Sequence, residues 1–248
     1  MKKVIRLSFV ALLLIAGTVF GQEQQINVKS FDKVIVSPHI EVNFQEGDTE
    51  LVTIESANVS TDKINVEVEG KILRIYLDGA KMHTKSKKVK TKKYKGRKDL
   101  YEGRKVVATV HYKSLNKLSI RGEETANFVS PLEQPDFHLT IYGESRVYFD
   151  ALTISDLTVA IYGESYLEIK EGNVANQVYR AYGESEVNTL GMRNQRTKIT
   201  AYGESNFRVN VSDRLKVTSY GEAEINYEGD PDVDRGIIIG EASIRKIG

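Results

Sequence analysis

Cysteine is absent from this 248-residue chain. Without thiols the protein cannot form disulfides, bind a metal through thiolates, use a cysteine nucleophile or carry a thioether-linked lipid at its N-terminus. Its stability must therefore come from packed apolar side chains and backbone hydrogen bonds. Residues 22–248 are numerous enough to bury a sizeable core, as one elongated domain or two closely joined halves.

Signatures of catalysis and of metal binding are also missing. The four histidines are scattered and lack metal-ligand spacing; they are His39, His83, His111 and His138. The chain contains neither a Gly-x-Ser-x-Gly nucleophile elbow nor a phosphate-binding loop. We therefore expect no cofactor and do not expect an enzyme.

Only one long apolar run occurs, from Leu7 to Phe20, and it follows Lys2, Lys3 and Arg6. A basic start, a short apolar middle and small residues before a polar stretch are typical of a secretory signal peptide, for which we predict cleavage after Gly21. The run is short for a membrane-spanning helix, and no other segment is apolar enough to span a membrane. The sequence predicts an exported protein of the periplasm, cell surface or extracellular space, with no membrane span after cleavage.

Charge is unevenly distributed, although the formal net charge of the whole chain is only +1. Residues 81–98 contain ten Lys or Arg and no acidic residue. The rest of the chain after residue 21 contains 22 basic and 34 acidic residues, a net charge of −12. The sequence therefore predicts an acidic body with one strongly basic segment.

The basic segment permits three interpretations. Charge runs of this kind are usually solvated, mobile loops. Alternatively, the segment binds an anionic polymer such as an acidic polysaccharide or lipopolysaccharide; nucleic acid is not expected as a partner of an exported protein. In the third interpretation it contacts the acidic body of another copy, so that the protein self-associates. The candidate anion-binding residues are Lys87, Lys88, Lys90, Lys92 and Lys93.

A repeat of about 20 residues dominates the second half of the chain. The dipeptide Gly-Glu occurs in seven copies, four of which read Tyr-Gly-Glu-Ser. The glycines are separated by 21, 20, 20, 20, 18 and 19 residues; they are Gly122, Gly143, Gly163, Gly183, Gly203, Gly221 and Gly240. Around each glycine the apolar residues alternate with period two, which indicates half-buried strands, and turn-prone pieces separate these strands.

Short strands with this period and no helical interval favour a β-solenoid, in which each repeat forms one coil and buries its apolar face against its neighbours. Successive coils would lie about 4.8 Å apart. The predicted fold class is all-β, a right-handed parallel β-solenoid with an irregular N-terminal β portion; the hand follows the strong preference of parallel crossover connections. A β-sandwich of hairpins would explain the alternation but not the recurrence of one tetrapeptide in register.

The predicted organisation has four parts. Residues 1–21 form the signal peptide, residues 22–80 an N-terminal β portion or cap, residues 81–105 the basic loop and its connection, and residues 106–248 the repeat solenoid. The last three parts would form one continuous domain from about residue 31 to residue 248, because terminal coils of repeat proteins are commonly atypical.

Stacked coils place equivalent side chains in columns. Glycine and serine of the repeat would face inward where each coil bends, whereas tyrosine and glutamate would point outward. Aromatic neighbours on adjacent strands stabilise a sheet by roughly 0.2–1 kcal/mol per pair, but carboxylates about 4.8 Å apart repel by roughly 0.9 kcal/mol in water. The candidate ligand-binding residues are Tyr142, Glu144, Tyr162, Glu164, Tyr182, Glu184, Tyr202 and Glu204.

The repeated glutamates leave three interpretations open. Their carboxylates accept hydrogen bonds from turn amides or tyrosine hydroxyls, contact a glycan or a cationic surface, or hold hard cations such as Ca²⁺. The nonapeptide pattern of calcium-binding β-helices is absent, so whether the chain has a metal site is undecided. Polysaccharide cleavage by paired carboxylates is disfavoured, because identical repeated groups provide no singly tuned acid or base.

Residues from about Phe31 to the C-terminus resemble the auto-transporter adhesin head GIN domain family, a domain of unknown function in exported bacterial proteins. The resemblance lies in FDKVIV...IEVNFQEGD, INVEVEGKILRIYL, LNKLSIRGEE and the closing YEGDPDVDRGIIIGEASIRKIG. The family usually has Ser-Gly-Ser or Ser-Gly-Gly where this chain has Tyr-Gly-Glu-Ser, so the tyrosine and glutamate columns depart from it. The resemblance implies a solenoid-like all-β fold in an exported protein and supplies no catalytic residues.

These observations lead to one functional hypothesis with two alternatives. We expect an exported, non-catalytic binding or structural module of the cell envelope, adhesin-like, that uses a repeated Tyr-x-Glu outer face. Its expected partners are an envelope polysaccharide or a surface protein. The alternatives are a self-associating structural protein of the envelope and a polysaccharide-active β-helix enzyme.

Overall fold

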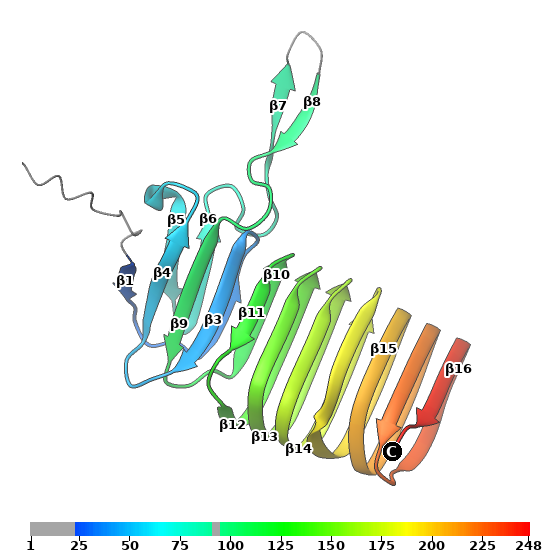
Figure 1. Ribbon diagram of the computed structural model, residues 1–248. Helices are drawn as coiled ribbons and strands as arrows, with labels where there is room; N and C mark the ends of the chain where they lie inside the picture. Colours follow the sequence, from blue (N-terminus) through cyan, green and yellow to red (C-terminus); the bar gives the residue numbers. More distant parts are fainter. Residues whose placement is uncertain (1–22, 91–94) are drawn as a thin grey trace, which may run out of the picture.

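The computed structural model describes residues 23–90 and 95–248. Strands make up most of this part of the chain, which contains no α-helix and one short 3₁₀ turn, Thr61–Lys63. About six turns of a parallel β-solenoid form its C-terminal part (Figure 1). The predicted fold class is confirmed. Among the described residues, no helix has the length and apolar character needed to cross a membrane.

The N-terminal part begins the same stack and then opens into two flanking groups of strands. Strands β2 (Lys33–Val36) and β3 (Ile40–Glu46) pair in parallel with the strands of the next coil. Strand β2 continues outward to β6 (Ile72–Leu77) and β5 (Ile64–Glu69), and β3 continues to β9 (Val106–Tyr112), β4 (Leu51–Ala57) and β1 (Gln24–Asn27). The strands β1, β4 and β5 pair antiparallel, so regular coiling begins after them.

Parallel pairing with an offset of about one repeat defines the solenoid. Its strands are β10 (Lys117–Gly122), β11 (Thr125–Phe128), β12 (Leu132–Gly143), β13 (Arg146–Gly163), β14 (Tyr166–Tyr182), β15 (Ser185–Glu228) and β16 (Asp232–Lys246). Ile141 lies beside Ile161, which lies beside Ala181 on the next rung. The sequence period is therefore the length of one coil.

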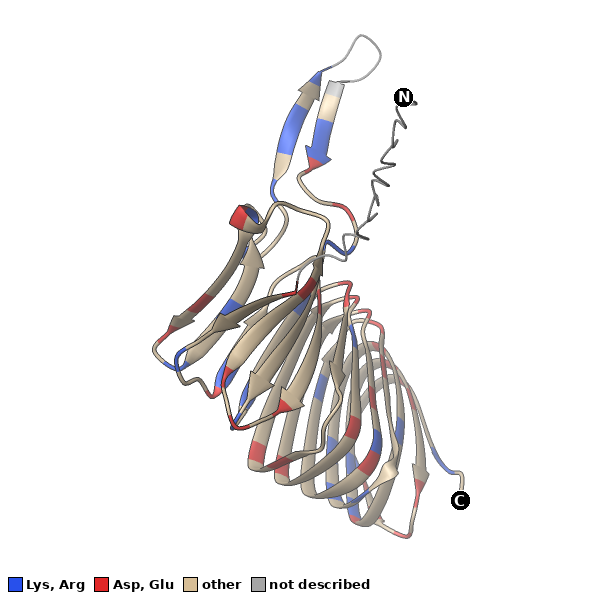
Figure 2. Cartoon of the chain, turned by 60° about the vertical axis from the view of Figure 1, so that its left-hand side comes forward, with Lys and Arg blue, Asp and Glu red and all other residues tan. Residues whose placement is uncertain are grey.

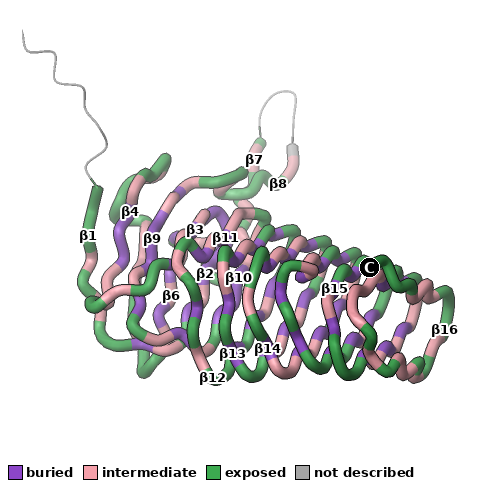
Figure 3. Tube along the Cα trace, turned by 60° about the horizontal axis from the view of Figure 1, so that its bottom comes forward, coloured by how far each residue is buried: buried purple, intermediate pink, exposed green. Residues whose placement is uncertain are grey.

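The apolar residues of the alternating pattern form one core that runs along the solenoid axis (Figure 3). Within β13, Leu157, Val159 and Ile161 are all buried, whereas the residues between them are more exposed. The core is continuous with the N-terminal part, because the ring of Phe128 stacks on Phe44 of β3 and on Phe149 of β13, with centroid separations of 4.7 and 4.1 Å.

Each coil bends at the repeated tetrapeptide, and the bend explains the glycine and the serine. Gly163 has a φ of +120°, and a Cβ at this position would lie 2.3 Å from the carbonyl oxygen of Gly143 on the preceding rung. Two residues later the chain turns back to the core, where the buried Ser165 hydroxyl donates a hydrogen bond of 3.0 Å to the same carbonyl oxygen. Glycine thus permits close stacking of the corners, and serine satisfies a backbone acceptor inside the bend.

The basic segment forms a separate two-stranded antiparallel hairpin, β7 (Ser86–Lys90) and β8 (Lys95–Asp99). Figures 1 and 2 show it projecting from the N-terminal end of the body. The predicted basic loop thus contains two strands that pair with each other, and whether it is solvated or contacts a partner stays a prediction. The candidate residues Lys87, Lys88 and Lys90 lie on β7, whereas Lys92 and Lys93 lie outside the described residues.

Candidate interaction surface

The tyrosines of the repeat form an external stack of nearly parallel rings. Ring centroids are separated by 5.0 Å between Tyr142 and Tyr162 and by 4.8 Å at each later step, with interplanar angles between 1° and 9°. The stack comprises Tyr142, Tyr162, Tyr182, Tyr202 and Tyr220. The Arg121 guanidinium lies over the Tyr142 ring, 5.4 Å from its centroid. This tyrosine column therefore stabilises the coils against one another.

Stacking also limits what the tyrosine column can bind. Both faces of each interior ring contact a neighbouring ring, so the surroundings reach only ring edges and hydroxyl groups. A sugar or a cation that recognises an aromatic residue uses the ring face. The column is therefore poorly suited to bind a glycan by stacking.

The glutamates lie on the other side of the bend, where they line a groove of about 560 Å³. The groove runs across four coils and contains the glutamate column, defined here as Glu144, Glu164, Glu184 and Glu204. Its other wall is formed by residues that follow the bend, among them Arg146, Tyr166 and Glu186. No residue of the tyrosine column lines it. The two columns thus occupy adjacent surfaces, and the groove of about 560 Å³ belongs to the glutamate side.

The four carboxylates of the glutamate column have no partner among the described residues. They accept no hydrogen bond from a turn amide or a tyrosine hydroxyl and form no ion pair. The turn amides are already used by the backbone: the Glu144 amide donates to the Gly122 carbonyl oxygen and the Glu164 amide to that of Gly143, both at 2.9 Å. Hydrogen bonding within the stack therefore does not account for the repeated acid.

Other positions of the solenoid balance charge between neighbouring coils. Lys170 pairs with Asp150 on the preceding rung at 2.6 Å, and Arg214 pairs with Asp234 on the following rung at 2.7 Å. Asp156 accepts a hydrogen bond from Asn176 on the following rung, whereas its neighbour on the preceding rung is Asp136. The glutamate column repeats one sign of charge without such compensation, so its acids are not a general consequence of stacking.

A convergent metal site is not present in the residues that the structure describes. No group of three or more His, Cys, Asp or Glu side chains there comes together closely enough to hold a metal ion. Calcium takes six to eight oxygen ligands at about 2.3–2.6 Å, whereas the glutamates follow one another at the spacing of the rungs. The column is better suited to several separate positive charges than to one coordinated cation.

The acidic groove continues toward the C-terminal coil. A further hollow of about 250 Å³ is lined by Glu204, Glu222, Glu224 and Glu241 together with smaller polar residues. Ser205 also lies in its wall and is only 3% exposed. Its hydroxyl has no hydrogen-bond partner among the described residues, unlike the serines of the three preceding corners.

Positive charges lie opposite one another in the hairpin. Lys87 pairs in register with Lys98, and Lys88 pairs with Arg97. All four side chains are exposed. The Lys98 ammonium lies 3.3 Å from a Glu102 carboxylate oxygen, which compensates one of these charges. The hairpin and the glutamate column are therefore two exposed surfaces of opposite charge on one chain.

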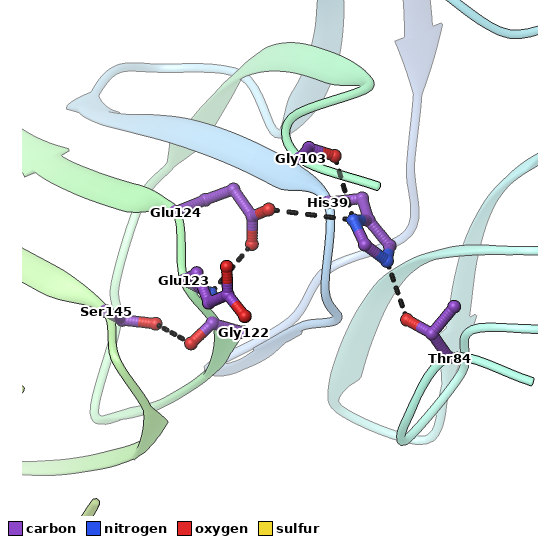
Figure 4. A network of polar contacts seen from close by, with 7 residues as sticks. All are labelled: His39, Thr84, Gly103, Gly122, Glu123, Glu124 and Ser145. Carbon is purple, nitrogen blue, oxygen red and sulfur yellow. Dashed lines mark hydrogen bonds and ion pairs between the residues drawn. The ribbon is translucent and has the colours of Figure 1, made fainter. Parts of the chain in front are cut away.

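The hairpin is attached to the body by a cluster around His39 (Figure 4). His39 Nδ1 donates to the Gly103 carbonyl oxygen at 2.9 Å, and Nε2 forms a hydrogen bond of 2.6 Å with the Thr84 hydroxyl. Nδ1 also lies 3.8 Å from Oε1 of Glu124, which occupies the inward position that serine has in later coils. Thr84 precedes the hairpin and Gly103 follows it, so one imidazole holds both connecting segments.

Sequence reasoning did not assign a role to this cluster. Two signals were available: Pro38 interrupts the alternation before His39, and the first repeat has Glu124 where four others have serine. A groove of about 450 Å³ extends from Met82 at the base of the hairpin to Glu123 and Tyr142. The acidic side of the solenoid thus begins where the hairpin is attached.

Comparison with known families and solved structures identifies the family of the chain and supports its solenoid fold. The family profile described as "Putative auto-transporter adhesin, head GIN domain" matches residues 30–231. The chain belongs to this family. No curated protein matches it.

Solved structures share the fold of this GIN-domain protein over nearly the whole chain. A putative adhesin from Bacteroides fragilis is 19% identical, with a TM-score of 0.76 over 91% of this chain and 96% of that one. A putative adhesin from Parabacteroides distasonis is 18% identical, with a TM-score of 0.66 and the same coverage. A putative lipid binding protein from the same species is also 18% identical, with a TM-score of 0.65 over 92% and 96%. At these identities the likeness establishes the fold alone.

The GIN domain has one more groove that the sequence did not indicate. It has a volume of about 650 Å³ and lies at another corner of the coils, away from the glutamate column. Amide and hydroxyl side chains predominate in its wall, among them Asn173, Asn194, Gln195 and Ser212. Its residues lie in segments for which the sequence predicted only turns. No residue type recurs at these positions from coil to coil, so the sequence did not indicate a site there.

Proposed function

We propose that the protein is an exported, non-catalytic binding module of the cell envelope, and that the glutamate column contacts an extended cationic partner at the cell surface. The observation that carries this proposal is the set of four carboxylates in one groove, none of which has a partner among the described residues. Membership of a family described as adhesins supports a binding role. The sequence suggested a binding surface made of both tyrosines and glutamates. We restrict the proposed binding surface to the glutamates, because neighbouring rings cover the ring faces of the tyrosines.

Electrostatics explains why a cationic partner fits. Adjacent carboxylates at a spacing of about 4.8 Å repel by roughly 0.9 kcal/mol per pair in water, and this repulsion increases where solvent is partly excluded. A partner with several positive charges removes that repulsion while it forms its own ion pairs. The groove crosses the coils in a line, so it accommodates an extended chain of charges better than a compact ion.

An enzymatic role has less support from the geometry. A glycosidase needs two carboxyl groups with different protonation behaviour. The glutamate column repeats one residue at equivalent positions of successive coils. The family description likewise names an adhesin and no reaction.

Binding of a defined cationic probe tests the proposal. We expect fluorescently labelled poly-L-lysine to bind the wild-type protein at about 50 mM salt and to dissociate at about 500 mM, because screening weakens exposed charge contacts. The variant Glu144→Gln/Glu164→Gln/Glu184→Gln/Glu204→Gln should lose this binding, as measured by fluorescence anisotropy.

The matched control removes acids from the same solenoid outside the groove. Glu133 and Glu171 are exposed, and neither lines it. The variant Glu133→Gln/Glu171→Gln should bind the probe almost as the wild type does. If the quadruple variant bound as tightly as this control, the glutamate column would not be the binding site.

A further inference from the structure

The hairpin β7–β8 has a charge arrangement that opposes its own pairing. Lys87 faces Lys98 across the strands, and Lys88 faces Arg97. Like charges directly opposite each other destabilise a strand pair, and an isolated two-stranded hairpin is marginally stable in water. Lys87, Lys88 and Lys90 have no ion-pair partner among the residues that the structure describes. An anionic surface that covers the hairpin would therefore stabilise it.

The base of the hairpin is fixed to the body, whereas its strands are exposed. Besides the His39 contacts, the Ser37 hydroxyl donates to the Lys81 carbonyl oxygen at 2.7 Å, and the Tyr101 hydroxyl donates to that of Asp78 at 2.9 Å. Beyond this base the two strands form a sheet of their own, and they project away from the coils (Figures 1 and 2). The basic side chains are thus held where another molecule can contact them.

We propose that the hairpin of one copy binds in the glutamate groove of a second copy. This inference rests on the proposed function, because it names the cationic partner of the glutamate column. The two surfaces have opposite charge, and neither the four glutamates nor Lys87, Lys88 and Lys90 have an ion-pair partner among the described residues. One contact relieves the repulsion within both surfaces, which is the reason to favour a second copy over an unrelated partner.

The dimensions of the two surfaces agree. Three rung intervals separate Glu144 from Glu204, a distance of about 14 Å at the spacing of paired strands. Each five-residue strand of the hairpin extends over about 17 Å. A hairpin laid along the groove therefore matches the length of the glutamate column, with Lys88 and Lys90 on the same face of their strand.

The contact is heterologous, since it joins two different surfaces. Each copy has one hairpin and one groove. When the hairpin of one copy occupies the groove of another, the pair keeps one free groove at one end and one free hairpin at the other. Head-to-tail contacts of this type close into a ring or extend into a filament, depending on the rotation between copies. The protein would therefore form salt-sensitive multimers.

Complementation between two defective variants tests the inference. The hairpin variant Lys87→Gln/Lys88→Gln/Lys90→Gln retains the groove, and the quadruple glutamine variant of the glutamate column retains the hairpin. We expect each alone to be monomeric at about 50 mM salt. An equimolar mixture should have about twice the monomer mass and grow no further, because the pair has used its one intact contact. Light scattering coupled to size-exclusion chromatography measures these masses.

Controls and contrary outcomes are distinct. The wild type and Lys113→Gln/Lys117→Gln/Lys198→Gln, which removes three exposed lysines elsewhere, should both multimerise at about 50 mM salt and dissociate at about 500 mM. A mixture that stays monomeric would overturn the inference, and so would single variants that multimerise like the wild type. A third outcome is a monomeric wild type whose melting temperature depends on salt differently from that of the hairpin variant. The hairpin would then bind the groove of its own copy, and the inference would be wrong.

The proposed function fails separately from this inference. If the wild type stays monomeric but its glutamate column still binds poly-L-lysine, the column has a cationic partner other than a second copy. If a monomeric wild type binds an anionic polymer such as dextran sulfate, and the hairpin variant does not, the hairpin has an anionic partner instead. Both results would overturn self-association, and neither would contradict the role of the glutamates.

Discussion

The corner glycines show how a single residue determines whether the coils can stack. The carbonyl oxygen of Gly143 lies where a side chain of Gly163 would begin, and positive φ adds strain for any other residue. The same contact recurs at each later corner, where the glycine of one rung approaches the glycine of the preceding rung. The repeat of glycine is therefore a steric requirement of the fold.

Two glycine substitutions distinguish the steric clash with the preceding rung from the backbone strain of positive φ. Gly163→Ala should lower the free energy of unfolding by about 3 kcal/mol or more, since it adds a clash to the cost of positive φ. Gly70→Ala is the control, because Gly70 has a φ of +62° but open space around its Cβ position. It should cost about 1 kcal/mol. Urea denaturation measures both, and equal losses would contradict the steric account.

A buried tyrosine leads to a prediction at alkaline pH. Burial raises the pKa of Tyr112 to about 12. Between about pH 10 and 12 the unfolded chain loses this proton while the folded protein keeps it, so the free energy of unfolding falls as pH rises. Tyr112→Phe should remove up to about 3 kcal/mol of that fall. Urea denaturation at about pH 8 and 11.5 tests this, and identical pH dependence in the two proteins would refute it.

At the scale of elements, the two external columns have different roles. The stacked tyrosines contribute attraction between rungs, whereas the glutamates contribute repulsion that the solenoid must outweigh. Because the columns lie on opposite sides of the same bend, a change in one can be measured without altering the contacts of the other.

Substitutions at Tyr162 distinguish stacking from hydroxyl contacts. Tyr162→Ala removes two stacked pairs and should destabilise the protein by about 1–2 kcal/mol. Tyr162→Phe should be neutral within about 0.5 kcal/mol, because the ring remains and its hydroxyl has no partner among the described residues. Thermal unfolding measures the difference. A loss of stability in the phenylalanine variant would show that the hydroxyl matters.

Neutralising part of the glutamate column should stabilise the monomer. Glu164→Gln/Glu184→Gln removes the repulsion at three successive rung intervals, and we expect a gain of about 1–2 kcal/mol, or about 2–6 °C in melting temperature. The gain should shrink at high salt, where the wild-type repulsion is screened. Glu171→Gln, outside the groove, should leave the melting temperature unchanged. A lower melting temperature for the double variant would show that the carboxylates stabilise the fold.

At the scale of the whole molecule, the solenoid has an interior that is better protected than its last coil. Among the described strands, β16 pairs with β15 alone. Ile238 and Ile244 are half-buried, whereas Ile161 in an interior coil is 1% exposed. Neighbour contacts govern the local stability of stacked repeats.

Hydrogen exchange should reveal this gradient. We expect amides of residues 232–246 to exchange faster than those of residues 157–182, because opening the last coil breaks contacts with one neighbour and opening an interior coil breaks contacts with two. Mass spectrometry of peptides at about 500 mM salt measures the monomer without end contacts. Uniform protection along the solenoid would show that it opens as a single unit.

The sequence by itself determined the coil. A spacing of about 20 residues together with period-two alternation requires equivalent residues such as Ile141 and Ile161 to be neighbours, because only stacking buries the apolar face of each repeat. The same period places the tyrosines in one column and the glutamates in another. These features depend on spacing along the chain, so the sequence alone predicts them.

Only the tertiary structure decided what the columns offer to a partner. The angle of the bend separates Glu164 from Tyr162, and the orientation of the rings covers the tyrosine faces; neither follows from a repeat length. The pairing of Lys87 with Lys98 and the position of His39 depend on contacts between distant segments. Periodicity fixes which residues are neighbours, whereas exposure and charge compensation depend on how the backbone turns and what packs beside it.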